Sequence, residues 1–180
     1  MMSVLLVYAT IEGQTRKIAD AVEKQLKTLD RTVVTYNTAE KTAPVSFEGV
    51  DAVILAAPVH ERRHPETFEV FLAAHRAELE KCNTLLLSVS LSAAFPEGME
   101  EAAEYVTELE MRTKFTPNTE VLVAGAVRSL SYDYYSMQVL RHVVMRGREF
   151  DSTTEEHEFT DWDALQKEVA RFVEVEVVVN

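Results

Sequence analysis

The pattern that most limits which fold this chain can adopt is an alternation of short apolar runs with helical or polar stretches. The runs span residues 4–9, 32–36, 50–57, 84–91 and 120–127. They have no helical period, which is typical of strands buried on both faces. Between them, apolar residues recur at three- and four-residue steps, as at Ile18, Val22, Leu26 and Leu29, which indicates amphipathic helices. The alternation predicts an α/β fold with a five-stranded parallel sheet, helices on both faces and right-handed connections.

The helix boundaries follow from capping and turn residues. The first helix is expected at 14–29. Pro65 suits the first position of the second helix, because a proline has no backbone N–H to lose there. A third helix is expected after Gly98, and Thr160 is expected to cap a last helix at about 161–173.

The length of 180 residues suits a single domain over 1–180. The stretch 129–159 is too long for a simple connection and is expected to be an insertion before the last helix. Cys82 is the only cysteine, so no internal disulfide can form. There is no signal-peptide pattern, and no apolar run reaches the ~18 residues of a membrane span. A cytoplasmic location is expected.

The charge is unevenly distributed. The formal net charge is −12, from 18 basic and 30 acidic side chains, which argues against general nucleic-acid binding. From Arg128 to Arg148 the chain holds four arginines against Asp133 alone, so this segment carries +3 and the remainder −15. A solvated face and a docking surface for an anionic partner explain this segment equally well.

A second constraint is the motif Thr10-x-x-Gly13-x-Thr15 between the first strand and the first helix. In an open parallel sheet, ligands bind beyond the carboxyl ends of the strands, and a helix N-terminus there presents N–H groups that suit a phosphate. Gly13 permits a tight turn, and the two threonine hydroxyls can donate to phosphate oxygens. The Gly-Lys-Ser/Thr run of a triphosphate site is absent. The motif therefore predicts the phosphate of a bound cofactor, although a simple turn that caps the helix is the alternative.

This loop, the strand pattern and the length resemble the flavodoxin family. The resemblance implies a three-layer sandwich with strand order 2-1-3-4-5 and one flavin mononucleotide (FMN), whose phosphate lies on the first loop. It also implies that the loops 57–64 and 88–94 flank the isoalloxazine ring. The cofactor-binding residues expected on this basis are Thr10, Ile11, Glu12, Gly13, Gln14, Thr15, Pro58, Val59, His60, Ser90, Leu91, Ser92 and Ala93.

Further motifs narrow the resemblance. They are Glu12-Gly13-Gln14-Thr15, Gly125-Ala126-Val127-Arg128, Ser131-Tyr132-Asp133-Tyr134-Tyr135, Gly147 and Phe159-Thr160-Asp161-Trp162. In this order they resemble the flavodoxin-like, menaquinone-dependent protoporphyrinogen IX dehydrogenases of haem synthesis. The resemblance covers nearly the whole chain, and the insertion is its most specific part. It implies an FMN enzyme that passes electrons from a porphyrinogen to a membrane quinone.

The insertion has a composition that fits such a role. Tyr134, Met137, Leu140 and Val144 form an apolar stripe at helical spacing, while Arg141 lies on another face. Such a helix suits contact with anionic lipid at the inner face of the cell membrane, with quinone or with a propionate; a helix packed on the sheet with solvated arginines is the alternative. The residues expected to dock substrate or membrane are Arg128, Tyr134, Arg141, Arg146 and Arg148.

The sequence leaves other interpretations open. A flavodoxin-type electron carrier and a non-catalytic module with an empty flavin site both fit the pattern. His60 and His64 are expected to be solvated loop residues, although either could respond to the redox state of the flavin. No histidine–carboxylate spacing predicts a metal. The valine-rich tail at 175–179 can dock as an edge strand or mediate a homo-oligomer.

Overall fold

The computed structural model describes residues 1–40, 43–127 and 157–175. Within these residues, one parallel sheet of five strands has the order β2-β1-β3-β4-β5. The strands are β1 (Ser3–Tyr8), β2 (Thr32–Asn37), β3 (Ala52–Pro58), β4 (Asn83–Ser90) and β5 (Thr119–Ala124). Their parallel pairing places all five carboxyl ends at one edge of the sheet. The predicted fold class and strand order are confirmed.

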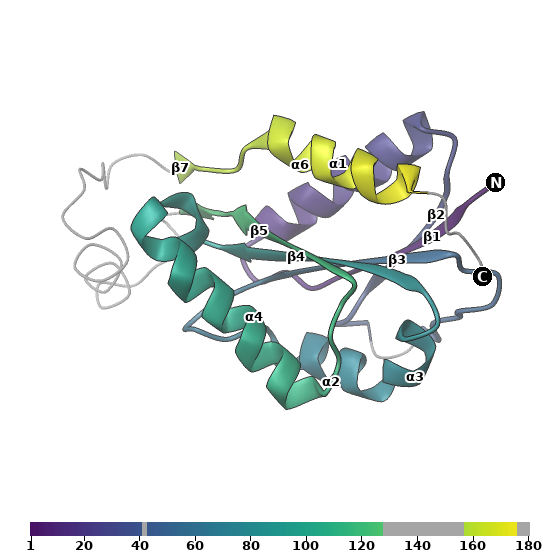
Figure 1. The fold of residues 1–180 in the computed structure, drawn as a ribbon, viewed down its shortest axis with the longest axis horizontal. Helices are drawn as coiled ribbons and strands as arrows, with labels where there is room; N and C mark the ends of the chain where they lie inside the picture. The colour runs from purple at the N-terminus through teal and green to yellow at the C-terminus, as the bar shows by residue number, and fades with distance from the viewer. Residues whose placement is uncertain (41–42, 128–156, 176–180) are drawn as a thin grey trace.

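Helices cover both faces of the sheet, which gives three layers (Figure 1). The helices are α1 (Gln14–Thr28), α2 (Glu66–Ala74), α3 (Arg76–Leu79), α4 (Met99–Thr113) and α6 (Trp162–Glu174). In the view of Figure 1, α1 and α6 lie above the sheet, and α2, α3 and α4 lie below it. Two short 3-10 turns, η1 (Ser92–Ala94) and η2 (Pro96–Gly98), connect β4 to α4.

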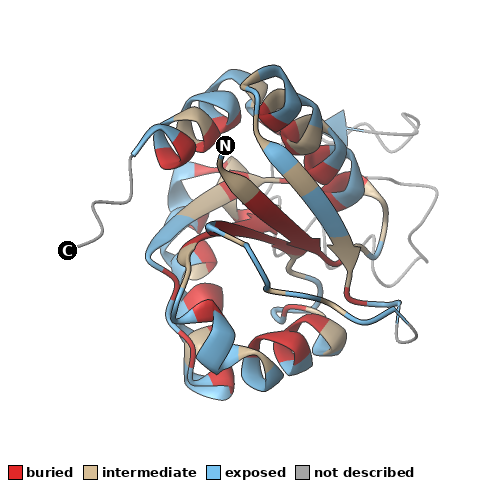
Figure 2. Cartoon of the chain, turned by 90° about the vertical axis from the view of Figure 1, so that its right-hand side faces the viewer, coloured by how far each residue is buried: buried red, intermediate tan, exposed pale blue. Residues whose placement is uncertain are grey.

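Each face of the sheet has its own apolar core. Alternate residues of β1 point to opposite sides, so that Val4 and Leu6 pack with α1 and α6, whereas Leu5 and Val7 pack with α2 and α4. All four side chains are at most 1% exposed. Figure 2 shows the buried residues in the central strands and on the inner faces of the helices. A strand buried on both sides needs a continuous apolar run, which explains the pattern of the sequence.

The last predicted strand, 120–127, is interrupted. β5 ends at Ala124, and residues 126–127 form a separate strand, β6 (Ala126–Val127), which pairs with β7 (His157–Glu158) in antiparallel orientation. Gly125 lies between the two strands. Its N–H donates to the Ser90 carbonyl at 3.0 Å, and its own carbonyl accepts from the Phe159 N–H at 3.0 Å. The backbone therefore leaves the parallel sheet at this glycine.

Two predicted helix starts are wrong by one residue. Asp161, not Thr160, caps α6, because its carboxylate accepts from the Ala164 N–H at 3.0 Å. The Thr160 hydroxyl instead donates to the Ala124 carbonyl at 2.6 Å. Pro65 is expected at the first helical position, but it is the N-cap of α2, and the helix begins one residue later at Glu66.

The predictions for the insertion fall mostly outside the described residues. Arg128, Tyr134, Arg141, Arg146 and Arg148 all belong to 128–156, as do most of the motifs quoted from this region. The limits of the domain and of the insertion at 129–159 stay predictions. Among the described helices, none has both the length and the apolar character to cross a bilayer.

Candidate functional site

A cleft opens at the edge of the sheet where the carboxyl ends of β1, β3, β4 and β5 meet. The empty space within it, including the part open to solvent, is about 480 Å³. Its lining residues are Ile11, Glu12, Gln14, Thr15, Pro58, Val59, His60, Val89, Ser90, Leu91, Gly125 and Ala126. Four chain segments thus form three walls: the loop before α1 with the start of this helix, the end of β3 with the loop that follows, and the ends of β4 and β5 together.

The first wall is the loop that leads into α1. Gly13 is the N-cap of this helix and has φ of 94°, a conformation that glycine adopts without strain. Its N–H donates to Thr10 Oγ1 at 3.0 Å, which closes the turn. As a glycine, this N-cap residue has no side chain that could accept from the first turn of α1. The positive end of the helix lies at the cleft, which Gln14 and Thr15 line.

The buried hydroxyl of Thr15 is an indication that a ligand binds at this helix end. Its side chain is 1% exposed, and its Oγ1 atom has no hydrogen-bond partner among the described residues. A buried hydroxyl without a partner costs stability, so native proteins rarely retain one without a reason. A phosphate oxygen at the N-terminus of α1 would accept this hydrogen bond. The residues present therefore fit an anionic cofactor group.

Gln14 holds this helix end against the returning segment of the chain. Its Nε2 atom donates to Glu158 Oε1 at 2.9 Å and to Thr160 Oγ1 at 3.0 Å. Lys17 Nζ lies 2.6 Å from the same Glu158 oxygen. Hydrogen bonds from Lys17, Gln14 and Trp162 and the charge of Lys17 outweigh the opposing effect of burial and lower the pKa of Glu158 to about 2. The first turn of α1 is thus fixed by residues 144 to 146 positions further along the chain.

The second wall comes from a tight two-residue hairpin after β3. The His60 N–H donates to the Arg63 carbonyl at 2.9 Å, and the Arg63 N–H donates to the His60 carbonyl at 3.1 Å. Glu61 and Arg62 form the turn, with φ of 50° and 67°. His60 Nε2 lies 3.8 Å from Glu12 Oε1. The hairpin therefore faces the loop before α1 across the cleft.

The third wall is formed by the ends of β4 and β5. Ser90 and Leu91, which are expected to bind the cofactor, line the cleft together with Val89, Gly125 and Ala126, which are not among the expected residues. Ser92 and Ala93 lie in η1 and do not line it. Ser92 Oγ donates to Glu101 Oε2 at 3.1 Å, so this hydroxyl stabilises the start of α4. The order of the strands brings β5 beside β4, which a search for loop motifs does not detect.

The predicted cofactor residues thus gather largely around one cleft. Nine of the thirteen line it, namely Ile11, Glu12, Gln14, Thr15, Pro58, Val59, His60, Ser90 and Leu91. Thr10 and Gly13 shape the first loop without lining the cleft. That these residues bind a cofactor stays a prediction at this point.

The expectation that His64 is a solvated loop residue is wrong. The side chain is 1% exposed, its Nε2 atom lies 2.9 Å from Ser88 Oγ, and its ring stacks on Phe68. Burial is the main cause that lowers the pKa of His64 from 6.5 to about 4; Glu69 opposes this effect and Arg112 adds to it. A neutral imidazole below the sheet is therefore part of the core.

Within the described residues, no group of three or more His, Cys, Asp and Glu side chains is placed to hold a metal ion. Cys82 is half-buried, and burial raises the pKa of its thiol. These features leave the cleft as the candidate functional site.

Comparisons with known proteins agree with this geometry. The sequence pattern of the flavodoxin domain matches residues 5–155. Protoporphyrinogen IX dehydrogenase (quinone) from Escherichia coli K12 is 28% identical over 166 residues, which covers 91% of each chain. The protein of the same name from Leishmania major is 24% identical over 179 residues, which covers 97% of this chain and 76% of that one. The structure of oxidised flavodoxin 1 from Bacillus cereus has a TM-score of 0.55 at 13% identity, and covers 97% of this chain and 99% of that one.

Proposed function

This chain belongs to the flavodoxin domain family, and from this premise we propose that its cleft binds one FMN. The observation that carries the proposal is the buried, unpartnered Thr15 hydroxyl beside the uncapped start of α1. A dianionic phosphate there would accept hydrogen bonds from this hydroxyl and from the N–H groups of the first helical turn. The isoalloxazine ring would lie against the loop at 58–60 and the loop at 89–91, which form two walls of the cleft.

We further propose that the protein is an FMN-dependent oxidoreductase that passes electrons from a porphyrinogen-type substrate to a quinone. Two curated relatives that match over at least 91% of this chain carry the name protoporphyrinogen IX dehydrogenase (quinone), which supports this proposal. Bound FMN would supply the electron-accepting chemistry, and the protein contributes binding, orientation and a surrounding field. The residues Arg128, Tyr134, Arg141, Arg146 and Arg148 stay our candidates for contact with substrate or membrane.

In this proposal the chain's own residues divide the work. Thr15 and the start of α1 would hold the phosphate, and Gly13 would give the backbone its tight approach. Val59, His60 and Leu91 would bound the ring. Ile11 is 51% exposed at the rim of the cleft, where an apolar substrate would meet it.

The function is tested in two steps on the full chain. Titration with FMN should quench flavin fluorescence with one site per chain. The loaded protein should then oxidise protoporphyrinogen IX with a menaquinone analogue as acceptor. Absence of turnover with FMN fully bound would remove the porphyrin assignment and leave an electron carrier, for which stepwise reduction should accumulate a semiquinone. Absence of FMN binding would remove the flavin assignment itself.

Thr15→Val is expected to weaken FMN binding by about tenfold or more, because a hydrogen bond to a charged phosphate is worth at least about 1.5 kcal/mol. Riboflavin, which lacks the phosphate, should bind both proteins equally. The matched control is Thr28→Val on the same helix, whose hydroxyl donates to the Lys24 carbonyl at 3.0 Å outside the cleft. Equal loss of FMN and riboflavin in Thr15→Val would contradict the proposed phosphate contact.

A further inference from the structure

The hairpin at 60–63 has an unfavourable backbone that its own residue types do not explain. Both central residues, Glu61 and Arg62, lie in the left-handed region, with φ of 50° and 67°. Turns of this kind favour Asn-Gly or Asp-Gly, because a long side chain in this region has an energetic cost. Neither residue here is one of the favoured types. Such a conformation persists only where surrounding contacts fix it.

Arg62 makes the first of these contacts, with the start of α4. Its guanidinium pairs with the Glu101 carboxylate and lies 5.5 Å from the centroid of the Tyr105 ring. Glu101 also accepts from Ser92 Oγ at 3.1 Å. Although burial acts in the opposite direction, hydrogen bonds from Tyr105 and Ser92 and the charge of Arg62 keep the pKa of Glu101 below its ordinary value. Glu101 thus joins the hairpin to the loop that follows β4.

Arg63 makes a second contact, on the other side of the turn. Its Nη2 and Nε atoms lie 2.6 and 3.1 Å from the two oxygens of Glu69 in α2. Arg112 in α4 donates to the same carboxylate at 2.9 Å. Glu69 is 6% exposed, so the carboxylate is shielded from solvent, although the Arg63 side chain is 55% exposed. Successive arginines therefore hold the hairpin to two different helices.

The hairpin carries the residues that line one side of the cleft. Val59 and His60 lie in that wall, whereas Glu61, Arg62 and Arg63 do not line it. The Val59 N–H donates to the Val89 carbonyl at 2.7 Å, which fixes the base of the hairpin to β4. The position of its tip depends on the arginine contacts. A change at Arg62 would therefore reach a bound ring through the placement of Val59 and His60, and a change at Glu101 would act through this same contact and through Ser92.

We propose that Arg62 and Glu101 are positioning residues, which fix the left-handed hairpin so that Val59 and His60 form a preorganised wall for the flavin ring. This inference rests on the proposed function, since it presumes that a flavin ring lies in the cleft. It assigns these two charged side chains a role through geometry and not through their field at the flavin. It also explains how a loop without a turn glycine keeps a fixed shape at this site.

The test uses Arg62→Met, Glu101→Met and the double variant, each titrated with FMN and with riboflavin. Both single variants should weaken the binding of both flavins by about fivefold, the scale of one lost ion pair. The double variant should lose less than the sum of the two single losses, because both changes remove the Arg62–Glu101 ion pair. The visible absorption band of bound FMN should shift in all three variants, since the ring meets a displaced wall.

The opposite charges of the two residues make the outcome decisive. If the residues acted on the anionic cofactor through their field, Arg62→Met would weaken FMN binding and Glu101→Met would strengthen it. Changes of opposite sign, or additive losses, would overturn the proposal. Flavin binding equal to that of the wild type in both single variants would overturn it too, while leaving the proposed function intact. No FMN binding by the wild type would overturn both.

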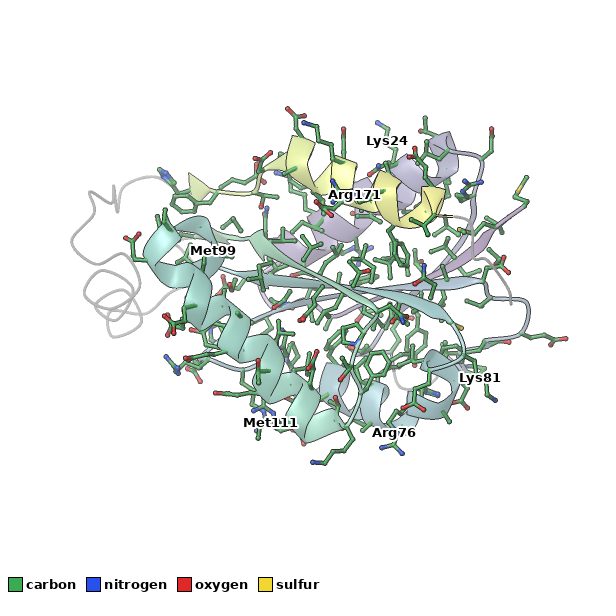
Figure 3. The ribbon with its side chains drawn as sticks, viewed as in Figure 1. Lys24, Arg76, Lys81, Met99, Met111 and Arg171 are labelled. Atoms are coloured by element: carbon green, nitrogen blue, oxygen red, sulfur yellow. The ribbon has the colours of Figure 1, made fainter. Side chains whose placement is uncertain are left out.

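Arg76→Met is the matched control. Arg76 is exposed, pairs with Glu80 at 3.7 Å and lies toward the opposite end of the molecule from Met99, where α4 begins (Figure 3). Like Arg62→Met, Arg76→Met removes one positive charge and one surface ion pair, but it does not affect the hairpin. The flavin affinity and the absorption spectrum of bound FMN should therefore stay unchanged. Denaturant unfolding of each apo-protein should give similar free energies for Arg62→Met and Arg76→Met. A large loss of stability in Arg62→Met alone would assign it a merely structural role and overturn the proposal.

Discussion

His64 is expected to make the protein about 3 kcal/mol less stable at pH 4 than at pH 7, relative to a variant without this histidine. In the unfolded chain the imidazole binds a proton near pH 6.5, whereas in the folded protein its pKa is about 4, mainly because of burial. The unfolded state therefore binds more protons between these two values, and the free energy of unfolding falls as the pH falls. The effect ends below about pH 4, where both states are protonated.

The free energy of unfolding of the wild type and of His64→Gln is measured by urea denaturation at a series of pH values from 7 to 4. The quantity compared is the difference between the two proteins at each pH. The difference removes the contribution of carboxylates, which titrate in both proteins. Ser88→Ala is the control, because it removes the hydroxyl 2.9 Å from His64 Nε2 and leaves the imidazole in place. In this control the free energy of unfolding should change with pH as it does in the wild type. The same pH dependence in the wild type and in His64→Gln would contradict the prediction.

Gly98→Ala is expected to lower the free energy of unfolding by about 3 kcal/mol, at the upper end of the usual cost of overpacking. A Cβ atom at Gly98 would lie 2.2 Å from the Ser92 carbonyl oxygen and 2.9 Å from its carbon. Both are backbone atoms, which cannot rotate away as a side chain can. The turn from η1 to α4 would have to open, and this turn places Glu101 beside Ser92.

Urea denaturation checks this prediction, with a lower midpoint and an unchanged slope as the expected result. Gly125→Ala is the matched control, because its Cβ would meet Val89 Cγ1 at 3.4 Å, an ordinary contact with a side chain. This control should change stability by less than about 1 kcal/mol. Equal midpoints for the two alanine variants would show that the Gly98 turn adapts without cost.

Most of the fold could be predicted because its main signals are local. A strand covered on both faces must be apolar throughout, so β1, β3 and β4 stand out in the sequence. Boundaries were less accurate where a side chain had two possible roles. Thr160 has the residue type of a helix cap, but its hydroxyl bonds to the Ala124 carbonyl, and Asp161 takes the cap. Which of the two residues caps the helix depends on the Ala124 carbonyl at the end of β5, which lies far away in the sequence.

The site could be predicted in part for the same reason. Gly13 and Thr15 lie two residues apart in a recognisable motif at the start of α1, and the cleft forms beside it. The burial of His64 could not be predicted, because it depends on Ser88 and Phe68 from other elements. The roles of Arg62 and Arg63 likewise depend on glutamates in α4 and α2. Sequence patterns locate groups within one segment, whereas these contacts are made by the packing of several.

The short ladder between β6 and β7 has a consequence for how this protein can be re-engineered. Val127 pairs directly with His157, so the chain departs and returns at points separated by about 5 Å, the usual spacing of paired residues. A hairpin loop of two to five residues spans such a gap. The 29 residues from 128 to 156 could thus be replaced by segments of different length and sequence while the five-stranded sheet is kept unchanged.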